Sequence, residues 1–548
     1  MLSNTRGISA VLTWLFIIWG SLNLFILNGY FSLWDQDESA YAGFALQMIE
    51  TGNWSIPEFL WSEPHRKTPF HFWTIAVSYK IFGVNEFAVR FPGGLAIMLT
   101  WLCTYFMGRR VFGHQAAVTA VLLLCASLFL PHLGKISVTD AVLLSWQTMA
   151  ALGIICFMHE PKKRWLFAVW LGVAGGVMTK GPPVLMLAGG MAFILLIFHP
   201  NRWRLLRLHP WFFLPLALLP LYFWGRQAWQ YDDGVFVMWM LDWYILDRAK
   251  GGVAFGQTGP PGYFLALFIL SFLPFLPLFF KSLGVMLKKG VFNSRRNINY
   301  LYFFAWFVPS WFLYEFIPSK LPSYALAAMP GIALLMGYYL QNSRFLYELN
   351  STSNKLFASF GLLLAIGIAI GLPLGLNSVI DIGFQPLLYS ALGIWLLFSI
   401  LQLVFIFKKK ALMWYQNGMI IGLFFVSVGW LLAVPLLEPA RSATKKAANV
   451  VIDKPNIEKV YLDIPYPLPS LPFYLHTKKI SYTDIRHEAG FENFTTAGHA
   501  WITDSERFQE RKNYLTESVV LQNYDTYEID GWISDKGRWL TYIVVVKK

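Results

Sequence analysis

Apolar segments long enough to cross a bilayer recur through the first 435 residues, and this repetition constrains the fold most strongly. The hydrocarbon core of a membrane is about 30 Å thick, so a spanning helix needs about 20 predominantly apolar residues. The candidate segments are about 8–29, 90–108, 115–132, 138–157, 164–179, 182–198, 208–225, 262–280, 298–314, 322–340, 356–375, 386–407 and 417–435. Because 56% of all residues are apolar and only 14% are charged, we predict an α-helical polytopic membrane protein with about 13 transmembrane helices.

Basic residues are concentrated in every second connection between these segments. They are Arg109, Arg110, Lys162, Lys163, Arg164, Arg202, Arg204, Arg207, Lys281, Lys288, Lys289, Arg295, Arg296, Arg344, Lys355, Lys408, Lys409 and Lys410. Cytoplasmic loops of membrane proteins carry an excess of lysine and arginine. The pattern therefore predicts a cytoplasmic N-terminus and a C-terminus on the outer face. It also accounts for most of the net charge of +13, so no nucleic acid partner is expected.

The composition changes from about residue 440. The chain continues with the charged, helix-like ARSATKKAANVVIDKP, then with short strand-like segments, and ends with the β-branched WLTYIVVVKK. Segments rich in β-branched and aromatic residues are typical of strands. We predict a transmembrane domain over residues 1–435 and a small α/β extracytoplasmic domain over 436–548. Cys103, Cys125 and Cys156 all lie in apolar segments, so neither a disulfide nor a cysteine metal site is expected.

The longest outer loop, 31–89, contains the carboxylates Asp37 and Glu38 in the sequence WDQDESAY. Carboxylates beside a membrane face are costly unless they have a role, and a positioned carboxylate suits proton abstraction from an acceptor. The alternative is an ordinary solvated start of a loop. Helical spacing after Asp37 and in FHFWTIAVSYKIFG predicts two interfacial helices. Between them, Arg66 and Lys67 suit a lipid phosphate, with simple attraction to anionic headgroups as the alternative.

The other outer loops each present an ionisable group. Asp140 begins a predicted span in SVTDAVLL, where stabilising the helix N-terminus is an alternative role. Lys180 in TKGPP and Lys320 in SKLPSYALAAMPG occupy outer turns, and lysine is a compact charge suited to phosphate. The long outer loop 226–261 suits a substrate-gating segment; its charged residues include Asp242, Asp247, Arg248 and Lys250. On one face, these groups would supply carboxylates for acid–base work and cations for a phosphate leaving group.

Six sequence segments occur in an order and spacing that resemble a known family: DESAYAGFALQMIETGNW, KTPFHFW, NEFAVRFPGGLA, SVTDAVLL, TKGPP and SKLPSYALAAMPGIALLMG. Together they resemble bacterial relatives of the protein O-mannosyltransferases, especially the aminoarabinose lipid A transferases. These are polyprenyl-phosphate-sugar-dependent glycosyltransferases of the GT-C type. The resemblance covers most of residues 1–435 and, more loosely, the C-terminal domain.

The resemblance implies roles for individual residues. It makes Asp37 the catalytic residue, with Glu38 in support, and it matches Asp140 to an aspartate at the membrane edge. Lys67 and Lys180 match phosphate-contacting lysines, which Arg66 adjoins. Lys320 and Tyr324 match a Lys-Leu-x-x-Tyr segment of the same phosphate site.

The chain departs from the family pattern at two positions. The family often has a glutamate before a Lys-Pro-Pro segment, where this chain has Arg66 before Lys-Thr-Pro. It often has a histidine in the loop where this chain has Gln257 nearby. In the aminoarabinose enzymes those two residues can hold a metal, so the resemblance implies no metal site and no cofactor here.

We therefore expect a multi-pass glycosyltransferase of the bacterial inner membrane, with a periplasmic C-terminus. Its partners would be a polyprenyl-phosphate sugar donor, membrane lipids, and an acceptor that is either lipid A or a protein hydroxyl. The rival from another class is a transporter or lipid-linked-sugar flippase, which should have charges near the bilayer midplane and an internal repeat. We see no repeat, and charged residues fall at segment ends. A scaffold protein would not explain why Asp37, Asp140, Lys180 and Lys320 share one face.

Overall fold

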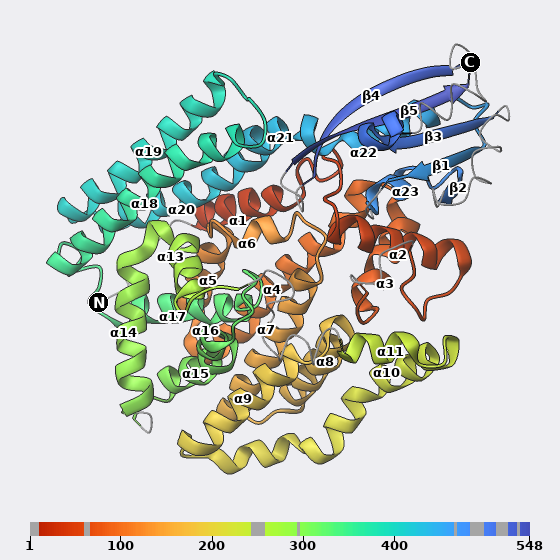
Figure 1. Cartoon of the computed structure of the whole chain (residues 1–548). Helices are drawn as coiled ribbons and strands as arrows, with labels where there is room; N and C mark the ends of the chain where they lie inside the picture. Colours follow the sequence, from red (N-terminus) through yellow and green to blue (C-terminus); the bar gives the residue numbers. More distant parts are fainter. Residues whose placement is uncertain are drawn as a thin grey trace.

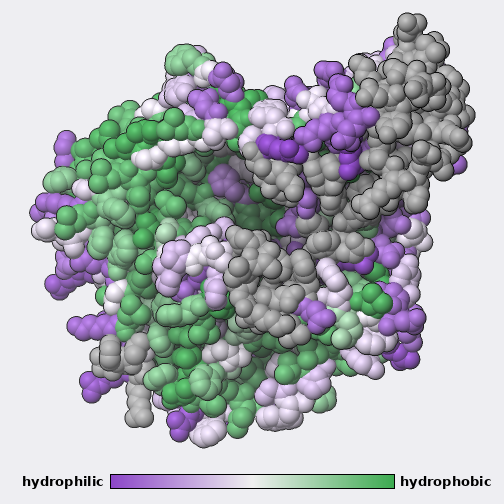
Figure 2. Space-filling view, in the orientation of Figure 1, coloured by the Kyte–Doolittle hydropathy of each residue, from purple (hydrophilic) through white to green (hydrophobic). Residues whose placement is uncertain are grey.

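The computed structural model describes residues 10–59, 66–242, 258–292, 296–464, 468–482, 498–510, 524–533 and 538–547. A large assembly of helices makes up most of the molecule, and a small β-sheet lies at one end of it (Figure 1). Hydrophobic residues cover most of the helical part on the face shown in Figure 2, whereas hydrophilic ones gather toward the C-terminal part. Both parts match the predicted combination of a helical membrane protein with a small C-terminal α/β domain.

Each predicted apolar segment contains a helix. The helices are α1 Ala10–Phe25, α4 Glu86–Phe112, α5 His114–Cys125, α7 Thr139–His159, α8 Lys163–Lys180, α9 Pro183–Phe198, α10 Pro210–Tyr231, α13 Tyr263–Ser271 with α14 Leu276–Phe292, α15 Ile298–Phe307, α17 Met329–Asn342, α18 Thr352–Asn377, α19 Pro386–Phe407 and α20 Ala411–Val428. Among the described residues, five helices are long and apolar enough to span a membrane, or up to seven if two bent pairs each count as one span. The total of thirteen spans stays a prediction.

Burial separates central helices from peripheral ones. The most apolar 18-residue stretch of α7 is 89% buried, so its apolar side chains contact other helices. It packs against α4 and α8. The corresponding windows of α18 and α19 are only 22% and 33% buried, which leaves long apolar faces for lipid. The two helices lie side by side with α20 at the edge of the assembly (Figure 1).

The predicted helices of the loop 31–89 are α2 Asp37–Thr51 and α3 Phe70–Phe82. Asp37 and Glu38 occupy the first turn of α2, where the positive end of the helix dipole stabilises their negative charges. Gly52 ends α2 with a φ of 74°, and its N–H bonds to the carbonyl of Met48. Most of α2 is buried, because it packs on α3 and on the C-terminal helix α23 Ser470–Tyr474. Other segments of the protein therefore enclose α2. The sequence had instead predicted a helix that lies in the membrane interface.

The C-terminal part is a mixed five-stranded sheet in the order β2-β1-β3-β5-β4. Its strands are β1 Lys459–Asp463, β2 Lys479–Tyr482, β3 His499–Asp504, β4 Tyr524–Ile533 and β5 Arg538–Lys547. Strand β1 runs parallel to β2 and β3, whereas β5 is antiparallel to β3 and β4. Helix α22 Ala443–Ile452 packs on the sheet and closes its hydrophobic core.

Candidate functional site

A cavity of about 390 Å³ brings together residues from distant parts of the sequence. The segment before α3, the ends of α7 to α9, the α11 segment (Val235–Leu241) with Met240, and the turn before α17 all contribute to its wall. Four predicted site residues line it: Lys67, Asp140, Lys180 and Tyr324. The rest of the wall is largely apolar, so charged groups are concentrated in a hydrophobic recess.

Asp140 and Lys180 form an ion pair in the wall of this cavity. Asp140 lies in the first turn of α7, and Lys180 is the last residue of α8, before Gly181 with its φ of 76°. The Lys180 Nζ lies 2.7 Å from Asp140 Oδ1, and the two side chains are only 17% and 13% exposed. Lys180 also lies 5.8 Å from the centre of the Tyr324 ring. The ion pair fixes the position of the Lys180 ammonium group at the cavity surface.

Lys67 connects the cavity to the start of α2. Its Nζ donates a hydrogen bond to the hydroxyl of Tyr41 and lies 4.7 Å from the centre of that ring. The Tyr41 hydroxyl in turn donates to Asp37 Oδ1 at 3.4 Å. Asp37 is exposed, whereas Tyr41 is buried. Asp37 therefore does not line the cavity itself, but a single tyrosine separates it from Lys67.

His71 lies behind this group of residues and is completely buried. Burial, followed by the charge of Lys67, lowers the pKa of His71 to about 3. Its Nε2 lies 3.3 Å from the Ser137 hydroxyl, and its ring meets Tyr41 edge to face at 5.7 Å. The pKa is thus well below 7, and the imidazole contacts Ser137 and Tyr41 in the buried layer behind the cavity.

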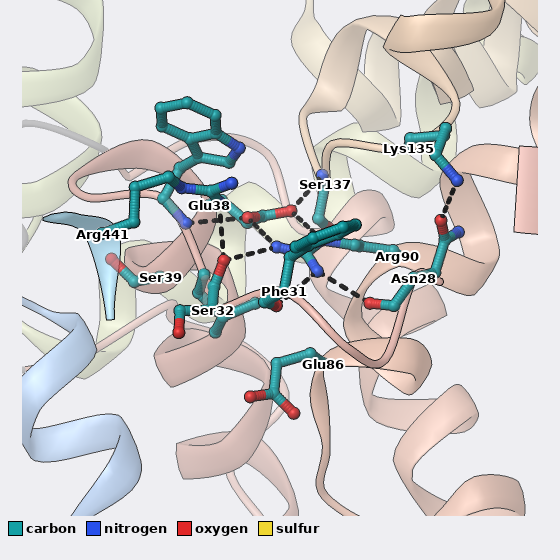
Figure 3. A network of polar contacts seen from close by, with 12 residues as sticks. Asn28, Phe31, Ser32, Glu38, Ser39, Glu86, Arg90, Lys135, Ser137 and Arg441 are labelled. Carbon is teal, nitrogen blue, oxygen red and sulfur yellow. Dashed lines mark hydrogen bonds and ion pairs between the residues drawn. The ribbon is translucent and has the colours of Figure 1, made fainter. Parts of the chain in front are cut away.

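Glu38 is committed to a buried network that is shown in Figure 3. Its carboxylate accepts hydrogen bonds from Arg90 Nε at 2.9 Å and Nη2 at 2.8 Å, and from the backbone N–H groups of Trp34 at 2.9 Å and Ser137 at 2.8 Å. Burial raises the pKa of Glu38, but the charge and hydrogen bonds of Arg90, with the two backbone bonds, lower it overall below its ordinary value. Glu38 in α2 therefore connects the loop at Trp34, helix α4 at Arg90 and the segment at Ser137, and it does not line the cavity.

Arg90 extends the same network to the end of the first span. Its guanidinium donates to the backbone carbonyls of Asn28 and Phe31, both at 2.7 Å, and of Ser32 at 2.9 Å. Lys135 adds a hydrogen bond to the Asn28 side chain at 2.7 Å (Figure 3). The loop that precedes Asp37 is thereby anchored to α4 and to the segment before α7.

Two of the predicted phosphate contacts lie outside the cavity lining. The Arg66 guanidinium stacks 5.6 Å from the centre of the Phe236 ring in α11. Lys320 Nζ is buried and donates to the backbone carbonyls of Tyr314 at 2.5 Å and Glu315 at 2.7 Å. Both cations thus have partners within the protein, and of the four cations predicted to bind phosphate only Lys67 and Lys180 line the cavity.

The residues present do not fit the metal site described for the aminoarabinose enzymes that the sequence resembles. A guanidinium has no acceptor lone pair, so Arg66 cannot replace an acidic ligand. Within the described ranges, no three His, Cys, Asp or Glu side chains converge as a metal would require. Gln257, Asp247, Arg248 and Lys250 lie outside the described residues.

Sequence reasoning missed three residues that bear on the site. Tyr41 is four positions after Asp37, a spacing that places both on one helix face and could have revealed their contact. Thr68 and Ser319 line the cavity, and each adjoins a lysine that the sequence did single out. Nothing in their spacing indicates that these two residues line the cavity.

Comparison with known proteins shows which proteins this chain resembles. Residues 66–224 match the family model of dolichyl-phosphate-mannose-protein mannosyltransferase. The fold is similar to the crystal structure of ArnT from Cupriavidus metallidurans bound to undecaprenyl phosphate, with a TM-score of 0.71, 19% identity and 98% of each chain covered. Together with the relatives described next, these matches show that the chain is similar to membrane glycosyltransferases.

The curated relatives are more specific. The undecaprenyl phosphate-alpha-4-amino-4-deoxy-L-arabinose arabinosyl transferase of Edwardsiella ictaluri is 27% identical over 394 residues, which are 68% of this chain and 68% of the relative. Transferase 2 of the same name from Proteus mirabilis is 29% identical over 349 residues. That alignment spans 62% of this chain and 61% of the relative, which is less than two thirds of its length.

Proposed function

We propose that this protein transfers a sugar from a polyprenyl-phosphate donor to an acceptor at the outer face of the bacterial inner membrane. The observation that carries the proposal is the presence of Lys67 and Lys180 in one largely apolar cavity, where Asp140 pairs with Lys180 and Tyr41 connects Lys67 to Asp37. Such a cavity suits a ligand that combines a phosphate with an isoprenoid chain. The names of the curated relatives, which specify undecaprenyl phosphate, support the same donor class.

The two lysines would act on the leaving group. In the transfer step, an acceptor oxygen forms a bond to the anomeric carbon while the bond from that carbon to the phosphate oxygen breaks. The bonding electrons leave with the polyprenyl phosphate, whose negative charge increases. Cations already in position stabilise such developing charge without reorganisation. Asp140 holds Lys180 in place and offsets its charge until the phosphate is bound.

We assign Asp37 to the acceptor. Glu38 is held by Arg90 and Asp140 by Lys180, whereas Asp37 is exposed at the start of α2. With a hydroxyl acceptor, Asp37 takes the proton that the attacking oxygen loses. With a lipid A phosphate, which is already ionised, Asp37 positions the acceptor instead. The sequence resemblance to aminoarabinose lipid A transferases favours a lipid acceptor, while the name of the matched family model, a protein mannosyltransferase, favours a protein as the second candidate.

The donor site is tested by Lys67→Ala and Lys180→Ala in protein reconstituted into liposomes. A charge-assisted hydrogen bond contributes about 1.5–3 kcal/mol, so each variant should lose about tenfold or more in its use of a polyprenyl-phosphate sugar. Lys446→Ala, at an exposed lysine in α22, is the matched control and should behave like the wild type. Unchanged donor dependence in both cavity variants, at equal membrane abundance, would refute the phosphate site.

The orientation follows from the basic loops and requires its own test. We infer that the N-terminus is cytoplasmic and that the sheet domain is periplasmic. Cysteine labelling at Lys163 and Lys409 should report the cytoplasmic side, and labelling at Lys446 the periplasmic side. A cytoplasmic result at Lys446 would place the cavity on the wrong face for this reaction. Mass spectrometry of lipid A and glycoproteins from a deletion strain would then identify the acceptor.

A further inference from the structure

Two tryptophans at one end of the β4–β5 strand pair lie apart from the core of the sheet. Trp532 and Trp539 are directly opposite each other across the two strands, and their rings meet edge to face with 6.0 Å between centres. Trp539 is 42% exposed. Next along the same face, Asp530 accepts a hydrogen bond of 2.6 Å from Thr541. This polar pair separates the two rings from the buried side chains further along the sheet.

This end of the sheet lies against the end of an apolar helix that is long enough to span a membrane. The Trp539 Nε1 donates a hydrogen bond of 3.0 Å to the backbone carbonyl of Val379, just beyond the end of α18. Strand β4 also contacts α21 Val434–Arg441, which ends the long apolar segment Ala411–Arg441 (Figure 1). The tryptophan pair therefore lies at the level where spanning helices pass from hydrocarbon to the headgroup layer.

The connection from α18 to α19 exposes further apolar side chains. Phe384 is 78% exposed and Leu387 is 74% exposed, and the Phe384 ring stacks on Tyr389 with 5.3 Å between centres. They continue the exposed apolar surface of α18 and α19, whose most apolar stretches are only 22% and 33% buried. Large exposed apolar surfaces mark sites of contact with a membrane or another protein. Continuity with two lipid-facing helices favours lipid as the cover.

Tryptophan has the chemistry that this boundary requires. Its ring buries a large apolar area, while its indole N–H needs a hydrogen-bond partner, and tryptophan is enriched where membranes meet water. The Val379 carbonyl already satisfies the indole of Trp539, so that ring can enter the headgroup layer without losing a hydrogen bond.

We propose that Trp532 and Trp539, with Phe384 and Leu387, anchor this end of the C-terminal sheet in the headgroup layer of the membrane. The partner is the bilayer itself. The inference does not depend on the proposed reaction, nor on which side of the membrane the sheet lies, because it requires only that α18 and α19 span the bilayer.

The test measures the depth of a nitroxide label at this end of the sheet. Arg538→Cys keeps both tryptophans and places the label on an exposed neighbour of Trp539. In phosphatidylethanolamine–phosphatidylglycerol liposomes, accessibility to oxygen, which concentrates in lipid, is compared with accessibility to a water-soluble nickel chelate. The ratio of oxygen to nickel accessibility should exceed that of a Glu528→Cys label. It should remain below that of Leu397→Cys, at an exposed position within α19.

Glu528→Cys is the matched control. Glu528 is exposed, belongs to β4 and lies on the same face of the strand as Trp532. A strand rises about 3.3 Å per residue, so Glu528 is about 13 Å further from the anchored end, and its label should remain in water. Wild-type protein treated with the same reagent gives the background from the native cysteines.

Replacing both tryptophans, by Trp532→Ser and Trp539→Ser, should make the Arg538→Cys label as accessible to nickel as the control label. The inference is overturned if the Arg538→Cys label already matches the control while both tryptophans are present. It is also overturned if neither reagent reaches that label, because protein, such as a second copy of this chain, would then cover it. Protection from nickel that survives the removal of both tryptophans would refute their role as anchors.

Discussion

Replacing Glu38 by glutamine should destabilise this protein more than almost any other single removal of a charge. Glu38 and Arg90 are 0% and 1% exposed in their side chains, and 2.8 Å separates Oε2 from Nη2. Glutamine keeps the size of the side chain but replaces one acceptor oxygen by a donor and leaves the guanidinium charge uncompensated. Breaking a buried pair in this way costs about 3–5 kcal/mol.

The expected loss follows from the geometry around both groups. The carboxylate oxygens accept four hydrogen bonds, two of them from backbone N–H groups that would face a repulsive amide N–H or remain unpaired. Arg90 would keep its bonds to the carbonyls of Asn28, Phe31 and Ser32, so the guanidinium cannot turn toward water. The loss of stability should therefore be concentrated in the loop that leads into α2.

The assay is thermal unfolding of the detergent-solubilised protein, followed for Glu38→Gln, Arg90→Met and the double variant. Since each single change leaves the other partner buried and unpaired, the double variant should lose clearly less stability than the sum of the two. Glu160→Gln removes an exposed partner of Lys162, and its melting temperature should match the wild type. A melting temperature for Glu38→Gln equal to that of Glu160→Gln, or additive effects in the cycle, would refute the reasoning.

Asp37→Asn should retain donor binding but lower transfer by about 10²–10⁴-fold, the usual loss of a positioned acid–base group; transfer near the wild-type rate would reassign the catalytic carboxylate. The pKa of His71 is about 3 in the folded protein against an ordinary 6.5, so the unfolded chain binds more protons between these values. Stability should therefore fall as the pH drops below about 6.5, and less steeply in His71→Gln when melting is followed between pH 7 and 5; equal slopes would contradict this. Transfer should survive chelation, because Arg66 stacks on Phe236 where an acidic ligand would be needed; chelator-sensitive transfer restored by a divalent ion would overturn that expectation.

Apolar length predicted the helical architecture, since it is a local property that a bilayer imposes on the sequence, whereas the orientation inferred from loop charge stays a prediction. The same reasoning anticipated that Lys67, Asp140, Lys180 and Tyr324 would meet, because it placed their loops on one face. It could not show which charges find partners within the protein. Lys320 looked like Lys180 in sequence, yet its ammonium group is satisfied by two backbone carbonyls.

The burial of α2 shows a second limit of the sequence pattern. Tyr41, Phe44 and Met48 have the helical spacing of an interfacial helix, and the structure does place them on buried surfaces. Their cover comes from α3 and from α23, which lies more than 400 residues further along the chain. Apolar spacing indicates that a helix face is covered, but it does not say whether lipid or a distant segment covers it.

This distant cover connects the C-terminal domain to the loop that contains the proposed catalytic carboxylate Asp37. The backbone N–H of Ser470 in α23 donates to Asp35 Oδ1 at 3.0 Å, and the Ser470 hydroxyl donates to the other oxygen of the same carboxylate. Asp35 also accepts a hydrogen bond of 2.6 Å from Ser39, so it joins the C-terminal domain to the first turn of α2. Since Asp37 lies within that turn, loosening the connection should displace the proposed catalytic carboxylate without touching the lysines of the phosphate site.

Ser470→Ala should therefore lower transfer while leaving undecaprenyl phosphate binding unchanged. A hydrogen bond to a charged group contributes about 1.5–3 kcal/mol, so a loss of about tenfold is expected, smaller than that of Asp37→Asn. Ser378→Ala, at an exposed serine beyond the end of α18, is the control and should transfer normally. If Ser470→Ala lowers the melting temperature but transfers at the control rate, the C-terminal domain stabilises the fold without positioning Asp37, because a positioning contact must change the rate of the reaction itself.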